Sequence, residues 1–396
     1  MSPASTRLAI VLSHPVQYYS PWFRWLRNNT ALEFKVFYLW DFGIKETLDP
    51  QFATSFKWDL DLLSGYDHEF VPNVARNPGT DHFRGLDNPA LPARLAQWRP
   101  TAVLLFGYNW LSHQRALWWA RRRGVPLLFR GDSHLLGRGQ PGQPSRILLK
   151  LLYRQFTAIT YVGAANRDYF LSLGVPATRL FFAPHSVDAA RFNSAVPAAR
   201  AAAQALRAEL GLAGKRVVLF AGKYSEAKQP LELLRAFHTA ATDADALVFV
   251  GDGTLKTDLT ALAHSRPDRH VRFLPFANQS EMPARYLLAD IFALPSRGHY
   301  ETWGLAVNEA MHLGVPCLVS HLVGCQRDLV TTGETGWVFP AEDSTALTTT
   351  LAQALRSAPE ELQQLGTAAR ARVARYTYEQ TTAGLLAAVA SLRQPS

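Results

Sequence analysis

The sequence has little cysteine and no long apolar run. Its 396 residues include two cysteines, Cys317 and Cys325, whose spacing suits neither a metal site nor a disulfide framework. A reducing cytoplasm is therefore the expected compartment. No apolar segment approaches the roughly 20 residues that span a bilayer. The stretch at residues 8–12 is too short for a signal-peptide core, so we interpret it as a first buried strand.

Acidic residues are scarce in the first half of the chain. Residues 1–190 hold 21 Lys and Arg against 13 Asp and Glu, whereas the remainder holds 20 against 19. The excess concentrates between Arg121 and Arg154, where Asp132 is the lone acid. This basic region is either a solvated face or a binding surface. As a binding surface it would contact an anionic membrane or an anionic, lipid-linked acceptor. Nucleic acid is disfavoured, because no nucleic-acid-binding motif accompanies the charge.

The length and the order of apolar runs predict two α/β domains. A chain of this size exceeds a usual single core, and 48% of its residues are hydrophobic. Strand-like runs at 102–106 and 126–129 flank a helical pattern at 110–123, which indicates a parallel sheet. A second sheet is expected to begin at 217–220. No G-x-G-x-x-G follows the first strand, which disfavours a dinucleotide-dependent dehydrogenase.

One stretch, residues 296–320, carries the clearest functional signal. It contains Glu301 and Glu309, and a helical pattern begins near Gly304 and stops at Gly314. With Glu301 in the preceding loop and Glu309 in the second turn, both carboxylates can face one ligand. The helix start between them suits a phosphate. The alternative from spacing alone is an amphipathic helix with two solvated glutamates.

The full string resembles the glutamate–seven–glutamate motif of the family 4 retaining glycosyltransferases, which have the GT-B fold. The matching residues are Pro295-Ser296, Glu301, Trp303 (usually Phe), Gly304, Leu305, Glu309-Ala310 and Gly314-Val-Pro316. The resemblance implies that Glu301 contacts hydroxyls of the donor sugar and that Glu309 binds the ribose. It also implies that backbone N–H groups near Gly304 and Leu305 hold the diphosphate, with Trp303 beside them.

Four further donor-side positions follow from the resemblance. Lys223 and Lys228 match a Gly-Arg-x(4)-Lys element, with Lys223 in place of Arg, and two cations at a strand-to-helix turn suit a diphosphate. Gly251 belongs to a turn that lies near the nucleotide in relatives. Phe276 stands where a backbone group usually meets the base, and the preceding Pro275 has no N–H to donate.

The acceptor side is less well specified. His14 stands in a first loop that is usually glycine-rich, and it is either an acceptor contact or a histidine that caps the turn. Arg130, Asp132 and His134 follow a predicted strand, where open α/β sheets bind ligands. Relatives often place a histidine there, facing the reaction centre. We favour His134, although the motif does not choose among the three and a histidine without a role is the alternative.

The resemblance implies a GT-B architecture of two Rossmann-like domains facing across a cleft. We expect an acceptor-binding domain at 1–192, an Ala-rich linker at 193–214 and a nucleotide-sugar domain at 215–375. The C-terminal helix at 376–396 is expected to pack back on the first domain. His185 and Ser186 replace an Asn-Gly pair that closes the first domain in relatives.

The implied activity is transfer of a hexose-type sugar from a UDP- or GDP-sugar to a glycan, lipid-linked or small-molecule acceptor. A role in bacterial surface polysaccharide or glycoconjugate synthesis is expected, with retention of configuration. No cofactor or metal is expected, and Asp59-Leu-Asp61 is interpreted as a chance match to a metal-binding D-x-D. The alternatives are a disaccharide phosphorylase and a non-catalytic binding subunit. A cytoplasmic protein, with peripheral contact to an anionic membrane, is expected.

Overall fold

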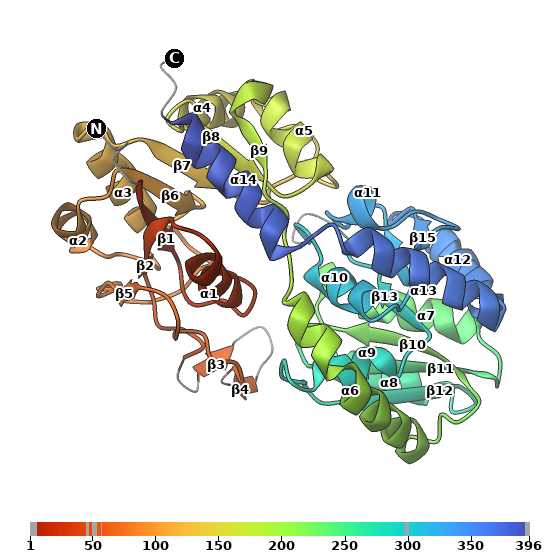
Figure 1. The fold of residues 1–396 in the computed structure, drawn as a ribbon. Helices are drawn as coiled ribbons and strands as arrows, with labels where there is room; N and C mark the ends of the chain where they lie inside the picture. Colours follow the sequence, from red (N-terminus) through yellow and green to blue (C-terminus); the bar gives the residue numbers. More distant parts are fainter. Residues whose placement is uncertain (1–5, 45–46, 50–53, 57, 298–300, 393–396) are drawn as a thin grey trace.

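The computed structural model describes residues 6–44, 47–49, 54–56, 58–297 and 301–392. It contains two parallel sheets, each covered by helices on both faces (Figure 1). Strands buried on both faces read as continuous apolar runs, as in Ala-Val-Leu-Leu-Phe of β6. The predicted α/β fold of two Rossmann-like domains is confirmed.

The first sheet has seven parallel strands in the order β5-β2-β1-β6-β7-β8-β9. Its strands are β1 (Arg7–Leu12), β2 (Glu33–Tyr38), β5 (His68–Phe70), β6 (Ala102–Phe106), β7 (Leu127–Arg130), β8 (Ala158–Tyr161) and β9 (Leu180–Phe182). Its helices are α1 (Ser20–Asn29), α2 (Leu91–Trp98), α3 (Leu111–Arg122), α4 (Gln143–Tyr153) and α5 (Ala164–Ser172), with a short helix η1 (Ala177–Arg179). A separate antiparallel pair joins β3 (Thr47–Asp49) and β4 (Thr54–Phe56).

The second sheet has six parallel strands in the order β12-β11-β10-β13-β14-β15. Its strands are β10 (Arg216–Ala221), β11 (Asp245–Val250), β12 (His270–Leu274), β13 (Ile291–Leu294), β14 (Cys317–Ser320) and β15 (Gly336–Phe339). The helices of this half are α6 (Ala189–Glu209), η2 (Glu226–Lys228), α7 (Pro230–Ala240), α8 (Lys256–His264), α9 (Met282–Leu287), α10 (Leu305–His312), α11 (Gln326–Leu329), α12 (Ser344–Arg356) and α13 (Pro359–Val373).

Both sheets reverse their strand order at one point. The reversal lies between β1 and β6 in the first sheet and between β10 and β13 in the second. Open α/β sheets bind ligands outside the carboxyl ends of the strands at such a switch point. The loops after β1, β10 and β13 are therefore the places where a site is expected on topological grounds.

The segment predicted as a linker with a helical middle, residues 193–214, is mostly helical in the structure. Most of it belongs to helix α6, which packs against α9 of the second half. Alanine has the highest helix propensity, so the Ala-rich composition that indicated a connector also favours a helix. The helix continues through Pro197. Among the described residues, none of the helices combines the length and apolar character that crossing a membrane requires.

Helix α14 (Tyr378–Ser391) returns from the second half and packs against α1, β8 and β9 of the first domain (Figure 1). Trp22 of α1 donates its indole N–H to Thr382 Oγ1 at 3.0 Å. Gly384 faces β9 so closely that a Cβ there would overlap the carbonyl oxygen of Phe182 and lie 2.9 Å from Ala183 Cβ. The helix therefore docks on the sheet through its smallest residue.

Gly384→Ala tests this docking. In an open helix the change stabilises by about 1 kcal/mol. Here we expect a loss of about 1–3 kcal/mol in the free energy of unfolding, since the added methyl meets backbone. Urea unfolding measures the difference, with the exposed Ala387→Ser on the same helix as a control. A stabilised Gly384→Ala variant would contradict the close approach.

Candidate active site

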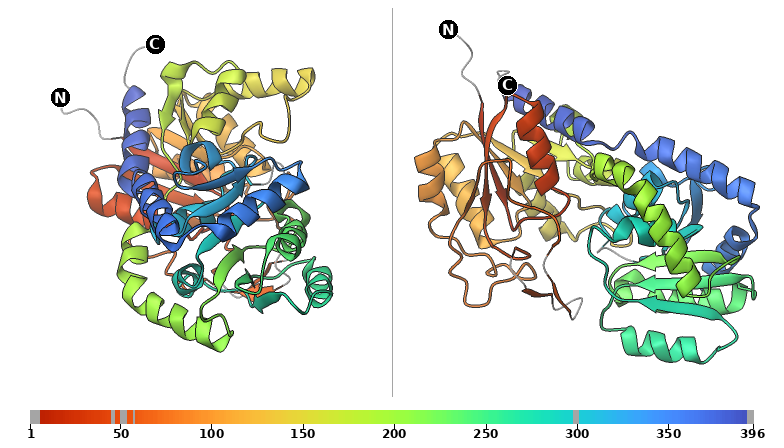
Figure 2. Two further views of the ribbon diagram at one scale, coloured as in Figure 1. Left: turned by 90° about the vertical axis from the view of Figure 1, so that its right-hand side faces the viewer. Right: turned by 60° about the horizontal axis from the view of Figure 1, so that its bottom comes forward.

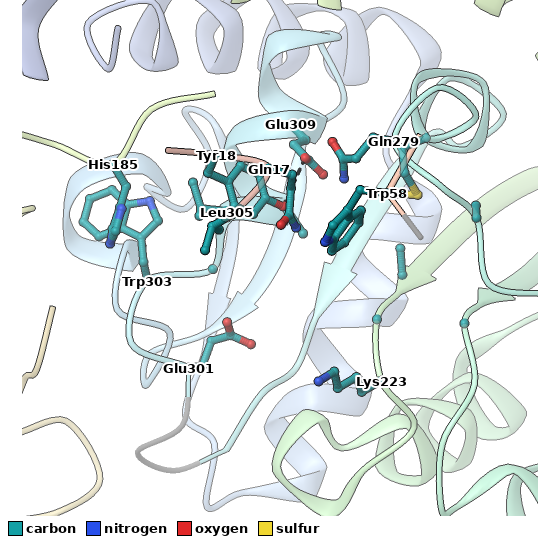
Figure 3. Close-up of a pocket in the computed structure, with 18 of the residues that line it drawn as sticks. Gln17, Tyr18, Trp58, His185, Lys223, Gln279, Glu301, Trp303, Leu305 and Glu309 are labelled. Carbon is teal, nitrogen blue, oxygen red and sulfur yellow. Dashed lines mark hydrogen bonds between the residues drawn. The ribbon is translucent and has the colours of Figure 1, made fainter. Parts of the chain in front are cut away.

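A cavity of about 510 Å³ lies between the two domains, where the loops after β1, β10 and β13 meet (Figure 3). Eleven of the predicted site residues line it: His14, Asp132, Lys223, Lys228, Gly251, Phe276, Glu301, Trp303, Gly304, Leu305 and Glu309. Arg130 and His134 are absent from the lining. The structure thus brings together the predicted donor-side residues and two of the four acceptor-side candidates.

Glu301 is paired with a cation inside the cavity. Its carboxylate forms an ion pair with Lys228 and accepts a hydrogen bond from Ser296 Oγ at 2.8 Å. The Glu301 side chain is 11% exposed and that of Lys228 is 27% exposed. Lys223 lines the same cavity, at the end of β10. One carboxylate, which can accept hydrogen bonds from hydroxyls, and two cations, which can bind phosphates, therefore line the same cavity.

Helix α10 opens toward this pair. Gly304, its N-terminal cap residue, has φ +98°, and a Cβ at that position would lie 2.9 Å from Val323 Cγ1 and 3.1 Å from Leu294 Cδ2. Only glycine fits this backbone without strain. No side chain caps the helix start. Its N–H groups and the positive end of its dipole are available to an anion in the cavity.

Glu309 lies deeper, and is 2% exposed. It accepts hydrogen bonds from Tyr286 Oη at 2.6 Å and from Tyr18 Oη at 3.2 Å. Burial raises the pKa of Glu309, and the opposing effects of Tyr286, Arg191 and Tyr18 do not cancel that rise. Tyr18 belongs to the loop after β1, so this contact joins the two domains across the cavity. The sequence offered no motif that singled out Tyr18.

An aromatic pair stands at one wall of the cavity. Trp58 of the first domain and Phe276 of the second have ring centroids 6.5 Å apart at 57°. Gly251 and Gly222 also line the cavity, and a Cβ on Gly251 would overlap the carbonyl oxygen of Gly222, so the absence of a side chain allows this close backbone approach. Figure 3 shows Trp58 over the cavity beside Gln279. Trp58 was missed because its segment matches no motif.

Asp132 is the acceptor-side candidate that reaches the cavity beside Glu301. Its carboxylate accepts a hydrogen bond from Thr302 Oγ1 at 2.8 Å and lies 3.4 Å from His185 Nε2. Burial lowers the pKa of His185, which favours the neutral ring. His14 also lines the cavity, edge-on to Phe42 with ring centroids 5.4 Å apart.

His134, which we expected to face the reaction centre, lies behind Glu301 instead. It is 3% exposed, and its Nε2 lies 3.2 Å from the carbonyl oxygen of Glu301. The backbone N–H of Leu136 donates to Nδ1 at 3.1 Å, which assigns the ring proton to Nε2. Burial lowers the pKa of His134 and favours this neutral form. The side chain fixes the Glu301 loop from the far side.

Arg130 also has a role in the first domain rather than in the cavity. Its guanidinium donates to the carbonyl oxygens of Ala183 at 2.8 Å and Pro184 at 3.3 Å. It lies 5.7 Å from the ring centroid of Trp22. These contacts tie the end of β7 to the segment that leaves β9, so the cation supports the cavity wall without lining it.

Trp303 joins the domains at the edge of the site. Its indole N–H donates to Asn308 Oδ1 at 2.8 Å, and its ring packs 5.7 Å from that of His185. A Cβ on Gly163 of the first domain would overlap the Trp303 ring. Asp328 accepts the N–H of Ala164 at 3.0 Å and so caps α5 from the second domain.

The two carboxylates of the Asp59-Leu-Asp61 match accept hydrogen bonds from different segments of the chain. Asp59 accepts hydrogen bonds from the N–H of Ser280 at 3.0 Å and from its hydroxyl. Asp61 accepts from the N–H groups of Leu63 and Ser64, both at 3.1 Å. Within the part of the chain that the structure describes, no three His, Cys, Asp or Glu side chains converge as metal ligands.

Two family models match the chain. "Glycosyl transferases group 1" matches residues 203–372, and "Glycosyl transferase 4-like domain" matches residues 66–186. The chain belongs to the group 1 glycosyltransferases. Its GT-B fold is shared with Anabaena HepE, solved with UDP and glucose, at a TM-score of 0.72 over 98% of this chain and 100% of that one. The identity is 16%, so this likeness concerns the fold.

Among curated relatives of this glycosyltransferase is the GDP-mannose-dependent alpha-(1-6)-phosphatidylinositol monomannoside mannosyltransferase of Mycolicibacterium smegmatis. It is 30% identical over 234 residues, which are 57% of this chain and 60% of the relative. The D-inositol 3-phosphate glycosyltransferase of Nocardia farcinica is 29% identical over 354 residues, or 80% of this chain and 76% of the relative. The match thus spans less than two thirds of the first relative and about three quarters of the second.

The buried Glu309 predicts a pH-dependent stability. Because its pKa is raised above the ordinary 4.5, the folded protein binds this proton more tightly than the unfolded chain. The resulting stabilisation is full below the ordinary pKa and is lost as pH rises through the folded-state pKa. Glu309→Gln stays neutral, so its free energy of unfolding should rise relative to the unmodified protein between about pH 4 and about pH 8.

Urea unfolding of both proteins across this range measures the difference, with the exposed Glu379→Gln as a matched control. A difference that stays constant with pH, or falls, would contradict a raised pKa at Glu309.

Proposed function

We propose that the protein transfers a hexose-type sugar from a UDP- or GDP-sugar to a glycan, lipid-linked or small-molecule acceptor. The proposal includes retention of configuration, no required metal, and a role in bacterial surface polysaccharide or glycoconjugate synthesis. The observation that carries it is the Glu301–Lys228 pair beside the uncapped start of α10 in one interdomain cavity. The names of two relatives include GDP-mannose and D-inositol 3-phosphate. They support a nucleotide-sugar as the proposed donor class.

The chemistry follows from where charge develops. When the bond between the sugar and the diphosphate breaks, negative charge grows on the leaving group. Lys223, Lys228 and the positive end of α10 stabilise that charge, and preorganised electrostatic stabilisation of this kind is often the largest single contribution to catalysis. Glu301 orients the sugar through its hydroxyls. The leaving phosphate accepts the proton of the attacking acceptor hydroxyl on the same face of the sugar, which retains the configuration.

The nucleotide is assigned to the deeper end of the cavity. Glu309 accepts hydrogen bonds from two tyrosine hydroxyls, which supports its assignment to hydroxyl donors such as those of ribose. Phe276 and Trp58 offer aromatic surface to a base. Asp132 lies at the first-domain side near Glu301, where an acceptor hydroxyl approaches.

A thermal-shift panel with UDP, GDP, ADP and CMP tests donor binding. A ligand at 100 times its Kd stabilises the folded state by about 2.7 kcal/mol. We expect UDP or GDP to raise the Tm, and Glu309→Ala to abolish the rise while leaving the fold intact by circular dichroism. If no nucleotide raises the Tm, the donor assignment fails and phosphate-dependent disaccharide cleavage becomes the activity to assay.

Removal of one cation tests the catalytic role. Lys228→Ala leaves Glu301 without its ion-pair partner and removes a charge from the leaving-group site, so kcat should fall at least about 100-fold. The assay follows nucleotide diphosphate release in the presence of EDTA. Lys256→Ala, which removes a lysine paired with Asp252 outside the cavity lining, is the matched control and should retain activity. Near-normal turnover by a folded Lys228→Ala enzyme is incompatible with the proposal.

A further inference from the structure

A second cavity, of about 640 Å³, lies at the amino end of the second sheet. Arg216 and Asp245, the first residues of β10 and β11, line it, whereas the last residues of the same strands, Ala221 and Val250, line the interdomain cavity. A strand of six residues spans about 20 Å, and the two linings have no residue in common among those that the structure describes. This amino-end pocket is therefore separate from the candidate active site.

The amino-end pocket lies on the side of the second domain that faces away from the first. Helix α6, green in Figure 1 and in the right-hand view of Figure 2, starts beside the first domain and ends away from it. Gly214 and Lys215, which follow that helix, line the pocket, as does Pro359 at the start of α13. The volume is in the range of cavities that hold small molecules. Because open α/β sheets usually bind ligands at the other end of their strands, this pocket has to be judged from its own side chains.

Arg216 brings an unsatisfied guanidinium group to the pocket. Its Nη1 is buried without a hydrogen-bond partner, and its side chain forms no ion pair with the described residues. In five other arginines of the described chain the buried nitrogen without a partner is Nε, and another nitrogen of the same guanidinium is paired. These are Arg130, Arg146, Arg179, Arg269 and Arg285. Since buried donors are nearly always satisfied, Arg216 indicates an acceptor that the chain itself does not supply.

Arg356 adds a second guanidinium group. It is the last residue of α12, it lines the pocket, and its exposed side chain forms no hydrogen bond or ion pair with the residues that the structure describes. Two further cations line the pocket but have partners. Lys215 Nζ donates to the carbonyl oxygen of Asp243 at 2.6 Å, and Arg207 Nη1 donates to that of Leu288 at 2.9 Å. The planar fork of arginine matches the oxygens of a phosphate, so two unpaired arginines in one pocket point to such a group.

Acidic residues and helix ends supply acceptors beside these cations. Asp290 lines the pocket and accepts the N–H of Val217 at 2.7 Å, and Asp245 accepts the N–H and the hydroxyl of Thr242, both at 2.8 Å. Helices α7 and α12 also end at the pocket, and the last carbonyl groups of a helix have no partner within it. Hydroxyl groups satisfy such acceptors, whereas a bare anion is repelled by them. The lining thus suits a molecule that carries both a phosphate and hydroxyl groups.

We propose that the amino-end pocket binds a small phosphate ester that carries hydroxyl groups, such as a sugar phosphate. Its phosphate, with a charge near −2 at neutral pH, meets Arg216 and Arg356, and its hydroxyl groups face Asp245 and Asp290. Four cations against two carboxylates leave the lining positive, which favours an anion. The inference goes beyond sugar transfer and does not depend on it, because the two cavities are separate.

Equilibrium dialysis of the full chain with radiolabelled glucose 6-phosphate, at constant ionic strength, tests the proposal. We expect saturable binding. Arg216→Met removes the guanidinium but keeps an aliphatic stem, and it should weaken binding at least about tenfold, as should Arg356→Gln. Unlabelled inorganic phosphate should displace the ester only at higher concentration than the unlabelled ester does, and glucose should not displace it, because each lacks one of the two kinds of group.

Matched controls separate this pocket from the interdomain cavity and from net charge. Lys223→Gln with Lys228→Gln removes the cations of the interdomain cavity, and Arg200→Gln with Arg375→Gln removes two exposed arginines outside both linings. Both double variants should bind the ester as the unmodified protein does. Binding lost in the lysine variant and kept in Arg216→Met assigns the phosphate to the interdomain cavity and overturns the proposal. No saturable binding by the unmodified protein, or tighter binding of inorganic phosphate than of the ester, overturns it as well.

Thermal unfolding gives a second readout. Because Arg216 has no partner within the described chain, Arg216→Met should leave the Tm of the protein without ligand unchanged or raised. Glucose 6-phosphate should raise the Tm of the unmodified protein and not that of the variant. A purely structural role for Arg216 predicts the opposite pattern, a lowered Tm without ligand and an unchanged response to the ester, and that result would refute the assignment.

Discussion

The site depends on a backbone turn, residues 301–304, that is held from both domains at once. Within the second domain, Gly324 N–H donates to the Glu301 carbonyl at 3.1 Å and Cys325 N–H donates to the Trp303 carbonyl at 2.8 Å. From the first domain, His134 meets the same Glu301 carbonyl and Asp132 meets Thr302. The turn sets both the direction of the Glu301 side chain and the start of α10. The geometry of this part of the cavity therefore depends on the position of the first domain.

This dependence explains why several residues at the boundary are small or unusually placed. Trp303 fits beside Gly163, and a Cβ on Gly324 would overlap the backbone of Thr302, so neither glycine can be replaced without moving the turn. The positive φ of Gly304 then aims α10 at the cavity. Close backbone approach thus fixes the turn together with the contacts of the His134 and Asp132 side chains. Tyr18 and Glu309 add a second interdomain contact deeper in the cavity.

The parts of the site that could be predicted from the sequence are those encoded locally. Glu301, Gly304 and Glu309 lie within nine residues, and a strand, a glycine and a helix pattern around them place the group in one βα unit. Lys228 likewise follows the end of β10 by only seven residues. The fold class was equally accessible, since strands buried on both faces leave continuous apolar runs.

What the sequence did not predict depends on contacts between distant segments. Tyr18 and Trp58 reach the cavity from first-domain loops that match no motif, and only the closed arrangement of two domains brings them to Glu309 and Phe276. His134 illustrates the complementary error. It follows β7 as expected, but its ring lies against the carbonyl oxygen of Glu301 instead of lining the cavity. Position after a strand does not decide side-chain direction.

The basic charge of the first half illustrates how structure sharpens a compositional signal. Composition alone left two alternatives, a solvated face and a surface for an anionic partner. Arginine and lysine are common on surfaces that contact only water, so their number does not decide between these alternatives. The structure adds a fact that composition lacks, namely that the charge borders an aliphatic stripe, Ile147, Leu148 and Leu151, on helix α4, whose other face is already packed.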